Sequence, residues 1–278
     1  MRRRWLFISF LGIGMEVNSD VLNSVQKNKE TLCFDFSNLR TINSFEIVEL
    51  FLYVLSIDYA DYQIKEKGEF FAKLESVNFF QELEKIKKSK SNAGGTKKKF
   101  YKLQSYVYKA DFYSSCEDII TLLINSGFEE DLALLLLSSL GELVDNSFFH
   151  NLGKWSTELG PLVFLLMQNL PEKKEFNISV ADLGIGFLET LKRNYPEVSS
   201  EEEAIKLALK ENTTGRIEKR GGNGLLFLQN NIFNGFKGSL LIRSRDTLVA
   251  VKKHEEVKLL KNNLPFRNST NIFINLKY

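Results

Sequence analysis

The sequence predicts an α/β fold divided into two domains. Apolar segments with the period of a helix alternate with shorter segments typical of strands along most of the chain. Of the 278 residues, 44% are hydrophobic and 26% are charged, and only four are proline. This composition is typical of a globular protein and argues against a long disordered region.

The best candidate for a linker is the segment from Ser89 to Lys99, which contains Gly94-Gly95 and several lysines. We therefore expect a smaller N-terminal α/β domain over residues 1–96 and a C-terminal domain over residues 97–278. Both lengths are ordinary for a single domain.

The N-terminal domain is expected to begin with a strand, a turn and a helix. Residues 31–36 (TLCFDF) form a short apolar run, which favours a strand. Asn43 or Ser44 can then cap a helix with apolar residues at helical spacing up to Ile57. A further helix is expected over residues 70–88.

The C-terminal domain is expected to contain one long helix over residues 129–151, where leucines form a wide apolar face. Gly127 suits the left-handed end of a preceding helix that begins at Asp111 or Ser114. Further helices are expected at residues 200–210 and 225–233, and strands at residues 100–108, 177–182, 238–244, 247–252 and 271–276.

Composition and the first residues favour a cytoplasmic protein without a membrane span. Cys33 and Cys116 lie among apolar residues and are interpreted as buried free thiols of a reducing compartment. Met1 to Gly14 superficially resembles a signal peptide, but its apolar run is too short for a membrane and no small-x-small cleavage site follows. It is interpreted as a first strand or as residues that precede a true start at Met15. The net charge of +2 gives no strong bias toward nucleic acid.

A polar stripe marks the end of the long helix. Glu142, Asn146 and His150 are spaced by four residues and therefore share one helix face, next to leucines. An acid, an amide and an imidazole in a row suggest a face turned toward a ligand. The alternative is an ordinary solvated helix face.

A second candidate lies directly after the expected strand at residues 177–182. Asp182 is followed by Gly184 and Gly186, an arrangement that lets the backbone approach a ligand while the carboxylate accepts a hydrogen bond from an exocyclic amine. The dinucleotide-binding fingerprint does not fit, because its third glycine is missing. Any strand-to-helix turn could carry the same residues.

A third candidate is the glycine segment Gly221-Gly222-Asn223-Gly224-Leu225, which opens a helix. Glycines at a helix N-terminus leave backbone N–H groups free for phosphate, where the helix dipole is positive. Thr213, Thr214 and Arg216 lie just upstream, in a segment expected to form a flexible lid. The alternative is a plain glycine-rich turn.

Taken in this order, the three segments resemble the GHKL ATPase superfamily, which contains gyrase, the ninety-kilodalton chaperones, histidine kinases and MutL proteins. The resemblance covers about Glu129 to Leu276. It implies a Bergerat-type fold, a layer of helices over a mixed sheet, with Mg²⁺-ATP bound between the two layers.

The resemblance also implies a role for each matched residue. Asn146 would be the Mg²⁺ ligand, and Glu142 the acid that polarises the attacking water in the hydrolysing members. Asp182 would read the adenine, and Thr213 would supply a hydroxyl near the adenine or the lid. The remaining expected ATP contacts are His150, Gly184, Gly186, Gly221, Gly222, Gly224 and Leu225.

Within the superfamily, the glycine segment is closer to histidine kinases and anti-sigma-factor serine kinases. Phe148-Phe149-His150 stands where gyrase and MutL show Asp-Ala after the Asn-Ser pair. The only histidines are His150 and His254, and neither precedes the ATP motifs on a dimerisation helix. An autophosphorylating histidine kinase is therefore not expected.

The segment from Leu32 to Ser44 resembles the core of STAS domains, in which a strand and a turn precede a helix that opens with Asp-Ser. Asn43 replaces that aspartate, and Ser44 stands at the position that is phosphorylated in the family. The alternative is an ordinary strand–helix unit.

Together these observations predict a soluble bacterial regulator that binds Mg²⁺-ATP and either hydrolyses it slowly or phosphorylates a Ser/Thr of a partner protein. A protein partner or a homodimer is expected, and nothing indicates nucleic acid. The alternative function is a non-catalytic, nucleotide-gated interaction module.

Overall fold

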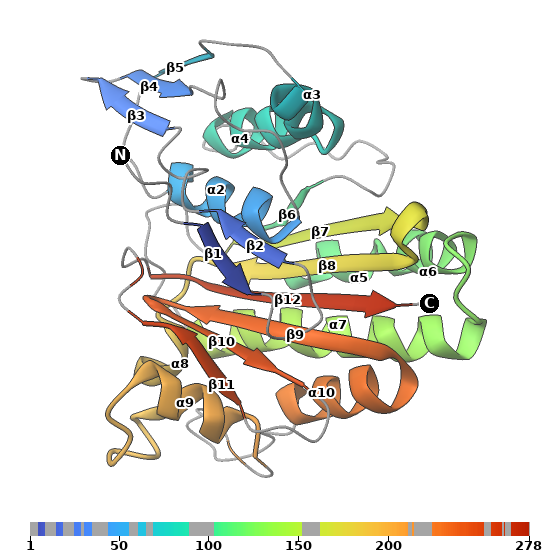
Figure 1. Ribbon diagram of the computed structural model, residues 1–278, viewed down its shortest axis with the longest axis vertical. Helices are drawn as coiled ribbons and strands as arrows, with labels where there is room; N and C mark the ends of the chain where they lie inside the picture. Colours follow the sequence, from blue (N-terminus) through green and yellow to red (C-terminus); the bar gives the residue numbers. More distant parts are fainter. Residues whose placement is uncertain are drawn as a thin grey trace. The chain divides into compact units, whose positions relative to one another are not determined.

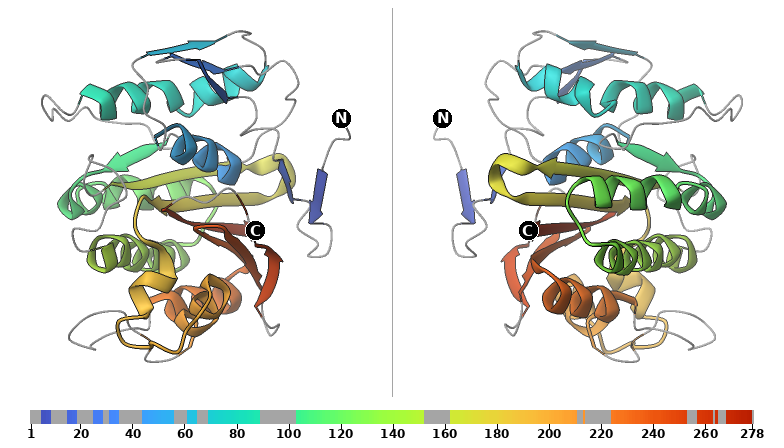
Figure 2. Two further views of the ribbon diagram at one scale, coloured as in Figure 1. Left: turned by 90° about the vertical axis from the view of Figure 1, so that its left-hand side faces the viewer. Right: turned by 90° about the vertical axis from the view of Figure 1, so that its right-hand side faces the viewer.

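The computed structural model of the chain is shown in Figures 1 and 2. It divides into two compact units, Met1–Asn92 and Ala93–Tyr278, which are described separately below. The expected linker at Ser89 to Lys99 lies outside the described residues. The structure describes residues 5–8, 15–18, 25–28, 31–34, 44–55, 61–64, 69–88, 103–151, 162–210, 213, 224–252, 257–262, 264 and 268–277.

Unit 1 is an α/β unit with two small sheets. Strands β1 (Trp5–Ile8) and β2 (Met15–Asn18) pair antiparallel. In the second sheet, β4 (Thr31–Phe34) lies between β3 (Val25–Asn28), its antiparallel neighbour, and β5 (Asp61–Ile64), its parallel neighbour. The strand expected at residues 31–36 is thus confirmed for its first four residues.

Helix α2 (Ser44–Leu55) connects the two parallel strands, as a parallel pairing requires, and begins where the sequence predicts. Residues 70–88, which were expected to be helical, are confirmed as helical except for a break at residues 77–78. The structure has two helices, α3 (Glu69–Ser76) and α4 (Phe79–Lys88), because Asn78 adopts a left-handed backbone with φ +60°. Phe34, Phe51 and Phe79 pack edge to face within the core of this unit.

Unit 2 is built on one large antiparallel sheet. Among the described residues it has seven strands in the order β11-β10-β9-β12-β8-β7-β6. The strands are β6 (Gln104–Tyr106), β7 (Val163–Leu170), β8 (Glu175–Asp182), β9 (Lys237–Ser244), β10 (Thr247–Val251), β11 (Lys258–Lys261) and β12 (Thr270–Lys277).

The expected mixed sheet is wrong for these strands, because every pairing between neighbours is antiparallel. Short turns join β7 to β8 and β9 to β10, and such turns can connect only antiparallel strands. The strand expected over residues 100–108 is confirmed only as the three residues of β6.

The described residues of unit 2 form six α-helices, and those near residues 129–151, 200–210 and 225–233 confirm the expected ones. The six are α5 (Lys109–Tyr113), α6 (Cys116–Asn125), α7 (Glu130–Asn151), α8 (Gly186–Leu191), α9 (Glu201–Ala208) and α10 (Gly224–Gly235). Gly127 has φ +98°, as its place after a helix predicts, and the Ser200 hydroxyl accepts a hydrogen bond from the Glu203 N–H to cap α9. The single helix expected from Asp111 or Ser114 is instead divided into α5 and α6.

Helices α7 and α10 pack against each other and against one face of the sheet, where they cover β7, β8 and β9 (Figures 1 and 2). Alternate strand residues such as Leu165, Ile178 and Ile274 belong to the same buried hydrophobic core as Leu136 and Leu140 of α7. Each fully buried side chain of this size stabilises the fold by about 1.5–3 kcal/mol.

Helix α7 is the one helix of the described residues that is long and apolar enough to cross a membrane, judged by length and composition alone. Its Leu136, Leu140 and Leu143 are buried in the core of unit 2, however, and the core helix of a soluble protein meets the same criteria.

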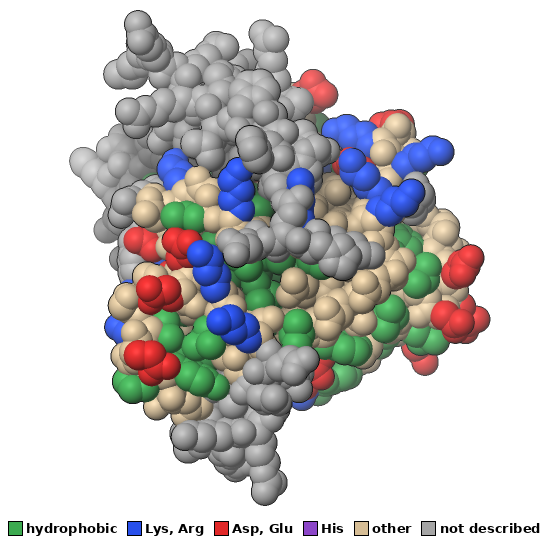
Figure 3. Space-filling model, turned by 60° about the horizontal axis from the view of Figure 1, so that its bottom comes forward, with side chains coloured by type: hydrophobic (Ala, Val, Ile, Leu, Met, Phe, Trp, Pro, Cys, Tyr) green, Lys and Arg blue, Asp and Glu red, His purple; other side chains and the backbone are tan. Residues whose placement is uncertain are grey.

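On the face drawn in Figure 3, acidic and basic side chains both occur, with a group of Lys and Arg at the upper right.

Candidate functional site

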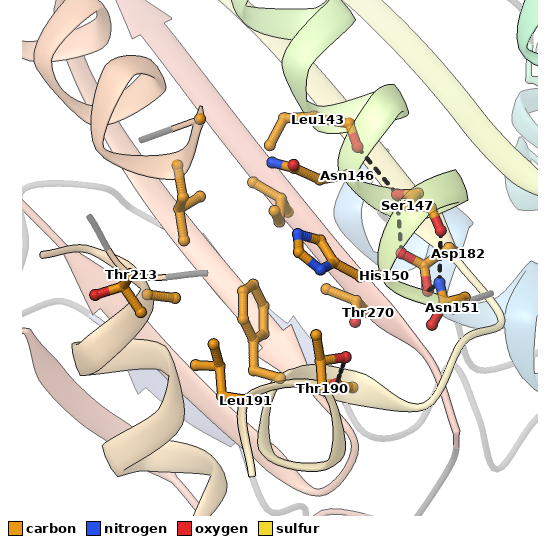
Figure 4. A pocket seen from close by; sticks show the side chains of 16 residues that line it. Leu143, Asn146, Ser147, His150, Asn151, Asp182, Thr190, Leu191, Thr213 and Thr270 are labelled. Carbon is orange, nitrogen blue, oxygen red and sulfur yellow. Dashed lines mark hydrogen bonds between the residues drawn. The ribbon is translucent and has the colours of Figure 1, made fainter. Parts of the chain in front are cut away.

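A pocket opens at the end of β8, between the last turns of α7 and the first residues of α10 (Figure 4). Its empty volume is about 690 Å³, including the space open to solvent. It is lined by Leu143, Asn146, Ser147, His150, Asn151, Asp182, Gly186, Phe187, Thr190, Leu191, Ala208, Thr213, Gly224, Leu225, Thr270 and Ile272.

Helix α7 contributes two of the three residues of the polar stripe to this pocket. Asn146 and His150 line it and are half-buried, as their spacing of one helical turn predicts. Glu142, one turn earlier, is exposed and lies outside the pocket lining. The stripe therefore runs from the pocket interior to its solvent-exposed edge.

Asp182 is the buried acid of the pocket. It is the last residue of β8 and pairs with Thr270 of β12, so both side chains lie on the helix-covered face of the sheet. Its Oδ2 accepts a hydrogen bond from the Ser147 hydroxyl at 2.9 Å. Its Oδ1 accepts from the Gly184 N–H at 2.8 Å and from the Asn151 amide at 3.2 Å.

Burial raises the pKa of Asp182 from its ordinary value of 3.8 to about 6, because an ionised carboxylate loses hydration inside the protein. The three hydrogen bonds from Gly184, Ser147 and Asn151 favour the charged form and lower the pKa, but they only partly offset the effect of burial. Asp182 is thus mostly ionised at neutral pH, and the ionised carboxylate acts as a hydrogen-bond acceptor.

The two glycines after Asp182 have different reasons to be glycine. A Cβ on Gly184 would overlap Oδ1 of Asn151, so that amide occupies the space of the missing side chain. Gly184 itself does not line the pocket. Gly186 lines it with φ +82°, and a Cβ there would meet Glu201 at 2.7 Å and Arg245 at 2.9 Å.

Glu201 and Arg245 hold the short helix α8 against the sheet. The buried Glu201 carboxylate accepts a hydrogen bond from the Leu188 N–H at 3.2 Å and lies 3.8 Å from the Arg245 guanidinium. The Ser244 hydroxyl accepts from the Phe187 N–H at 3.1 Å. Burial raises the pKa of Glu201, against the opposing effect of these partners. These contacts fix the pocket wall that Phe187, Thr190 and Leu191 form.

The start of α10 lies beside the polar stripe of α7. A Cβ on Gly224, the first residue of α10, would be 2.8 Å from Nδ2 of Asn146 and 2.9 Å from Oε2 of Glu142. Glycine thus allows the N-terminus of this helix to approach both side chains closely. Leu225 follows as a buried wall residue, and Thr213 also lines the pocket.

The structure therefore brings together most of the residues that the sequence singles out. Gly221 and Gly222 lie outside the described residues. Glu142 lies next to the lining through its contact with Gly224, and Gly184 through its contact with Asn151. The others all line one pocket, namely Asn146, His150, Asp182, Gly186, Thr213, Gly224 and Leu225.

Four residues of the site were not predicted from the sequence, namely Ser147 and Asn151, which hold Asp182, and Thr190 and Thr270, whose hydroxyl side chains line the pocket. A signal for the first pair exists, because Ser147 and Asn151 are polar residues one helical turn apart on the buried side of a leucine-rich helix. Thr270 gives no such signal, since only the sheet register places it beside Asp182.

The pocket has two chemically different ends. One end is apolar and contains the buried acceptor Asp182. At the other end, the N-terminus of α10 lies beside the side chains of Glu142 and Asn146. Among the residues that the structure describes, no three His, Cys, Asp or Glu side chains form a cluster that could enclose a metal ion. A Mg²⁺ ion that binds through one amide oxygen and the phosphates of a ligand needs no such cluster. Asn146 beside Gly224 fits that mode of binding.

Comparison of this chain with models of known protein families, and with curated proteins, found no match.

Proposed function

We propose that unit 2 is a Bergerat-type ATP-binding domain of the GHKL superfamily, in the branch of histidine kinases and anti-sigma-factor kinases. One observation carries the proposal. Three segments far apart in the sequence, the end of α7, the end of β8 and the start of α10, meet at one pocket with an acceptor at one end and a helix N-terminus near Asn146 and Glu142 at the other.

The acceptor end suits adenine. Asp182 is mostly ionised at neutral pH and can accept a hydrogen bond from an exocyclic amine. Leu143, Leu191 and Ile272 supply apolar surface for a flat ring. A ring bound there removes apolar surface from water, while the carboxylate sets its orientation.

The other end suits phosphates. The backbone N–H groups and the dipole at the start of α10 favour negative charge beside Gly224. Asn146 would hold Mg²⁺ there through its amide oxygen, and the ion, when bound, would neutralise phosphate charge. Glu142, exposed and 2.9 Å from the Cβ position of Gly224, would orient and deprotonate the attacking water or hydroxyl.

Phosphoryl transfer depends mainly on positioning and on charge stabilisation. The N-terminus of α10, Asn146 with its Mg²⁺ ion, and Glu142 would therefore be sufficient for slow ATP hydrolysis or for transfer to a Ser/Thr of a partner protein. The proposed protein is soluble and cytoplasmic, and it acts as a homodimer or together with a protein partner. A non-catalytic module that changes a partner surface when ATP binds is the alternative.

Unit 1 would be the regulatory part, similar to a STAS domain. The arrangement of β4, α2 and β5, in which a helix joins two parallel strands, supports this proposal. Ser44 begins α2, the position expected for a phosphorylated serine of that family.

Calorimetric titration with Mg²⁺-ATP tests binding, and release of ADP tests turnover. Glu142→Ala should abolish turnover while the affinity for ATP stays within about twofold, because Glu142 lies outside the pocket lining. Asn146→Ala should weaken binding only when Mg²⁺ is present. Asp131→Ala, which removes an exposed acid from the first turn of the same helix, is the matched control and should change neither quantity.

Absence of ATP binding by the wild-type protein would overturn the proposal. ATP binding without ADP release or phosphate transfer over hours would favour the gated module.

A further inference from the structure

Asn151, the last residue of α7, connects this helix to the loop after β8. It is 4% exposed, and its amide group makes three hydrogen bonds. Nδ2 donates to the Ser147 carbonyl at 2.8 Å and to Oδ1 of Asp182 at 3.2 Å, while Oδ1 accepts from the Ile185 N–H at 2.9 Å. The reversed amide would place donor against donor at Ile185, so the network fixes its orientation.

Gly184 and Asn151 form a matched pair. A Cβ on Gly184 would overlap Oδ1, Cγ and Nδ2 of Asn151, which is the whole of that side-chain amide. Gly184 is not among the described glycines with positive φ, so backbone conformation does not require a glycine here. The requirement is the space that Asn151 occupies.

The consequence concerns how Asp182 faces the pocket. Two carboxylate oxygens offer about four acceptor positions. Two donors act on Oδ1 and one on Oδ2, which leaves one acceptor position on Oδ2 for a ligand. The hydrogen bonds from the Asn151 amide and the Gly184 N–H occupy Oδ1 and fix the orientation of the carboxylate. The remaining acceptor position on Oδ2 therefore faces the ligand in one fixed direction.

We propose that Asn151 is a positioning residue for base selection: by fixing the Asp182 carboxylate, it makes the pocket prefer a base with an exocyclic amine over one with a carbonyl group at the same position. This inference rests on the proposed function, since it assumes that the ligand is a purine nucleotide. The residue itself would not need to contact the nucleotide.

The test compares Mg²⁺-ATP with Mg²⁺-ITP, in which a carbonyl replaces the amine, by calorimetric titration of the full chain. Wild type should bind ATP more tightly by roughly tenfold or more, as expected for one hydrogen bond to a charged acceptor. In Asn151→Ala this ratio of dissociation constants should fall at least about fivefold. Asn151→Asp keeps the side-chain size and the acceptor for Ile185 but loses the donor, and should lose the preference as well.

Asn275→Ala is the matched control. Asn275 is also buried and donates one side-chain hydrogen bond, to Asn177 at 2.7 Å, but it does not line the pocket. Its loss should lower stability without changing the ATP-to-ITP ratio. An unchanged ratio in both Asn151 variants would overturn the inference while leaving the proposed function intact. A wild-type protein that binds neither nucleotide would overturn the proposed function, and base selection by Asn151 with it.

The pair can also be tested without a ligand. Gly184→Ala alone should lower the unfolding midpoint, whereas the same substitution in the Asn151→Ala background should be tolerated, because the clashing amide is gone. Additive effects of the two substitutions would show that Asn151 does not fix this loop, and would overturn the inference even if ATP binds.

Discussion

Replacing Asp182 by asparagine should separate nucleotide binding from stability. The substitution preserves shape, and the oxygen of the new side-chain amide can still accept hydrogen bonds from Gly184 and Asn151. The Ser147 hydroxyl, which lies 3.1 Å from the Leu143 carbonyl, can donate to that carbonyl and accept from the new amide. The acceptor position that faces the ligand, however, becomes a donor, so Mg²⁺-ATP should bind more weakly by at least roughly tenfold.

The effect on stability follows from the pKa of Asp182. Because the pKa is about 6 in the folded protein and 3.8 ordinarily, folding takes up a proton between these pH values. The contribution of Asp182 to stability is therefore fully present below pH 3.8 and is lost as the pH rises to about 6. At about 1.36 kcal/mol for each pKa unit, the whole change is about 3 kcal/mol, and roughly half of it falls between pH 5 and pH 7.5.

Hydrogen exchange of peptides from β8 and β12, measured in increasing urea, gives the free energy of unfolding of unit 2. Between pH 5 and pH 7.5, wild type should lose about 1 to 2 kcal/mol more than Asp182→Asn, since other titrating groups such as Glu201 are common to both. Equal pH dependence in the two proteins would refute the assignment of a raised pKa to Asp182. Undiminished ATP affinity in the variant would refute its role as the acceptor for the base.

Two further predictions concern glycines that contact different parts of the molecule. Gly224→Ala should weaken Mg²⁺-ATP binding roughly tenfold yet change the unfolding free energy by less than about 1 kcal/mol, because the new Cβ displaces only the flexible ends of Asn146 and Glu142. Calorimetric titration and urea unfolding measure the two quantities, and an affinity that stays at the wild-type value would contradict this prediction. Gly238→Ala should do the opposite and lower the unfolding free energy by about 1–3 kcal/mol without affecting nucleotide binding. The new Cβ would lie 2.5 Å from the Ile232 side chain and 3.1 Å from the backbone oxygen of Asn275. A variant with full stability would show that the packing around Gly238 can relax.

The sequence by itself determined the elements whose signals are local. Apolar spacing predicted α7, and the glycine segment predicted the start of α10 to within one residue. Gly127 was correctly predicted as the left-handed residue after a helix. These features depend on neighbours within one or two helical turns, which a linear sequence displays directly.

Where the local signal was ambiguous, prediction failed. Strand β7 was not predicted, because its continuous apolar run, buried on both faces for most of its length, lacks the alternation that distinguishes a strand from a helix. The break at Asn78 depends on a single left-handed residue within an otherwise helical pattern. The mixed sheet was expected from the resemblance to the GHKL superfamily. The direction of each pairing depends on the strand order, which no single strand displays.

For the candidate site, the sequence supplied the residue types and the tertiary structure decided their relations. Asn146, Asp182 and Gly224 were recognisable separately, but only the packing of α7 and α10 on the sheet brings them to one pocket. The meaning of Gly184 changed most, since the sequence suggests room for a ligand and the structure fills that space with Asn151. Asn151 and Gly184 are 33 residues apart in the chain. Only the tertiary structure determines which side chain contacts a backbone atom that lies so far away in the sequence.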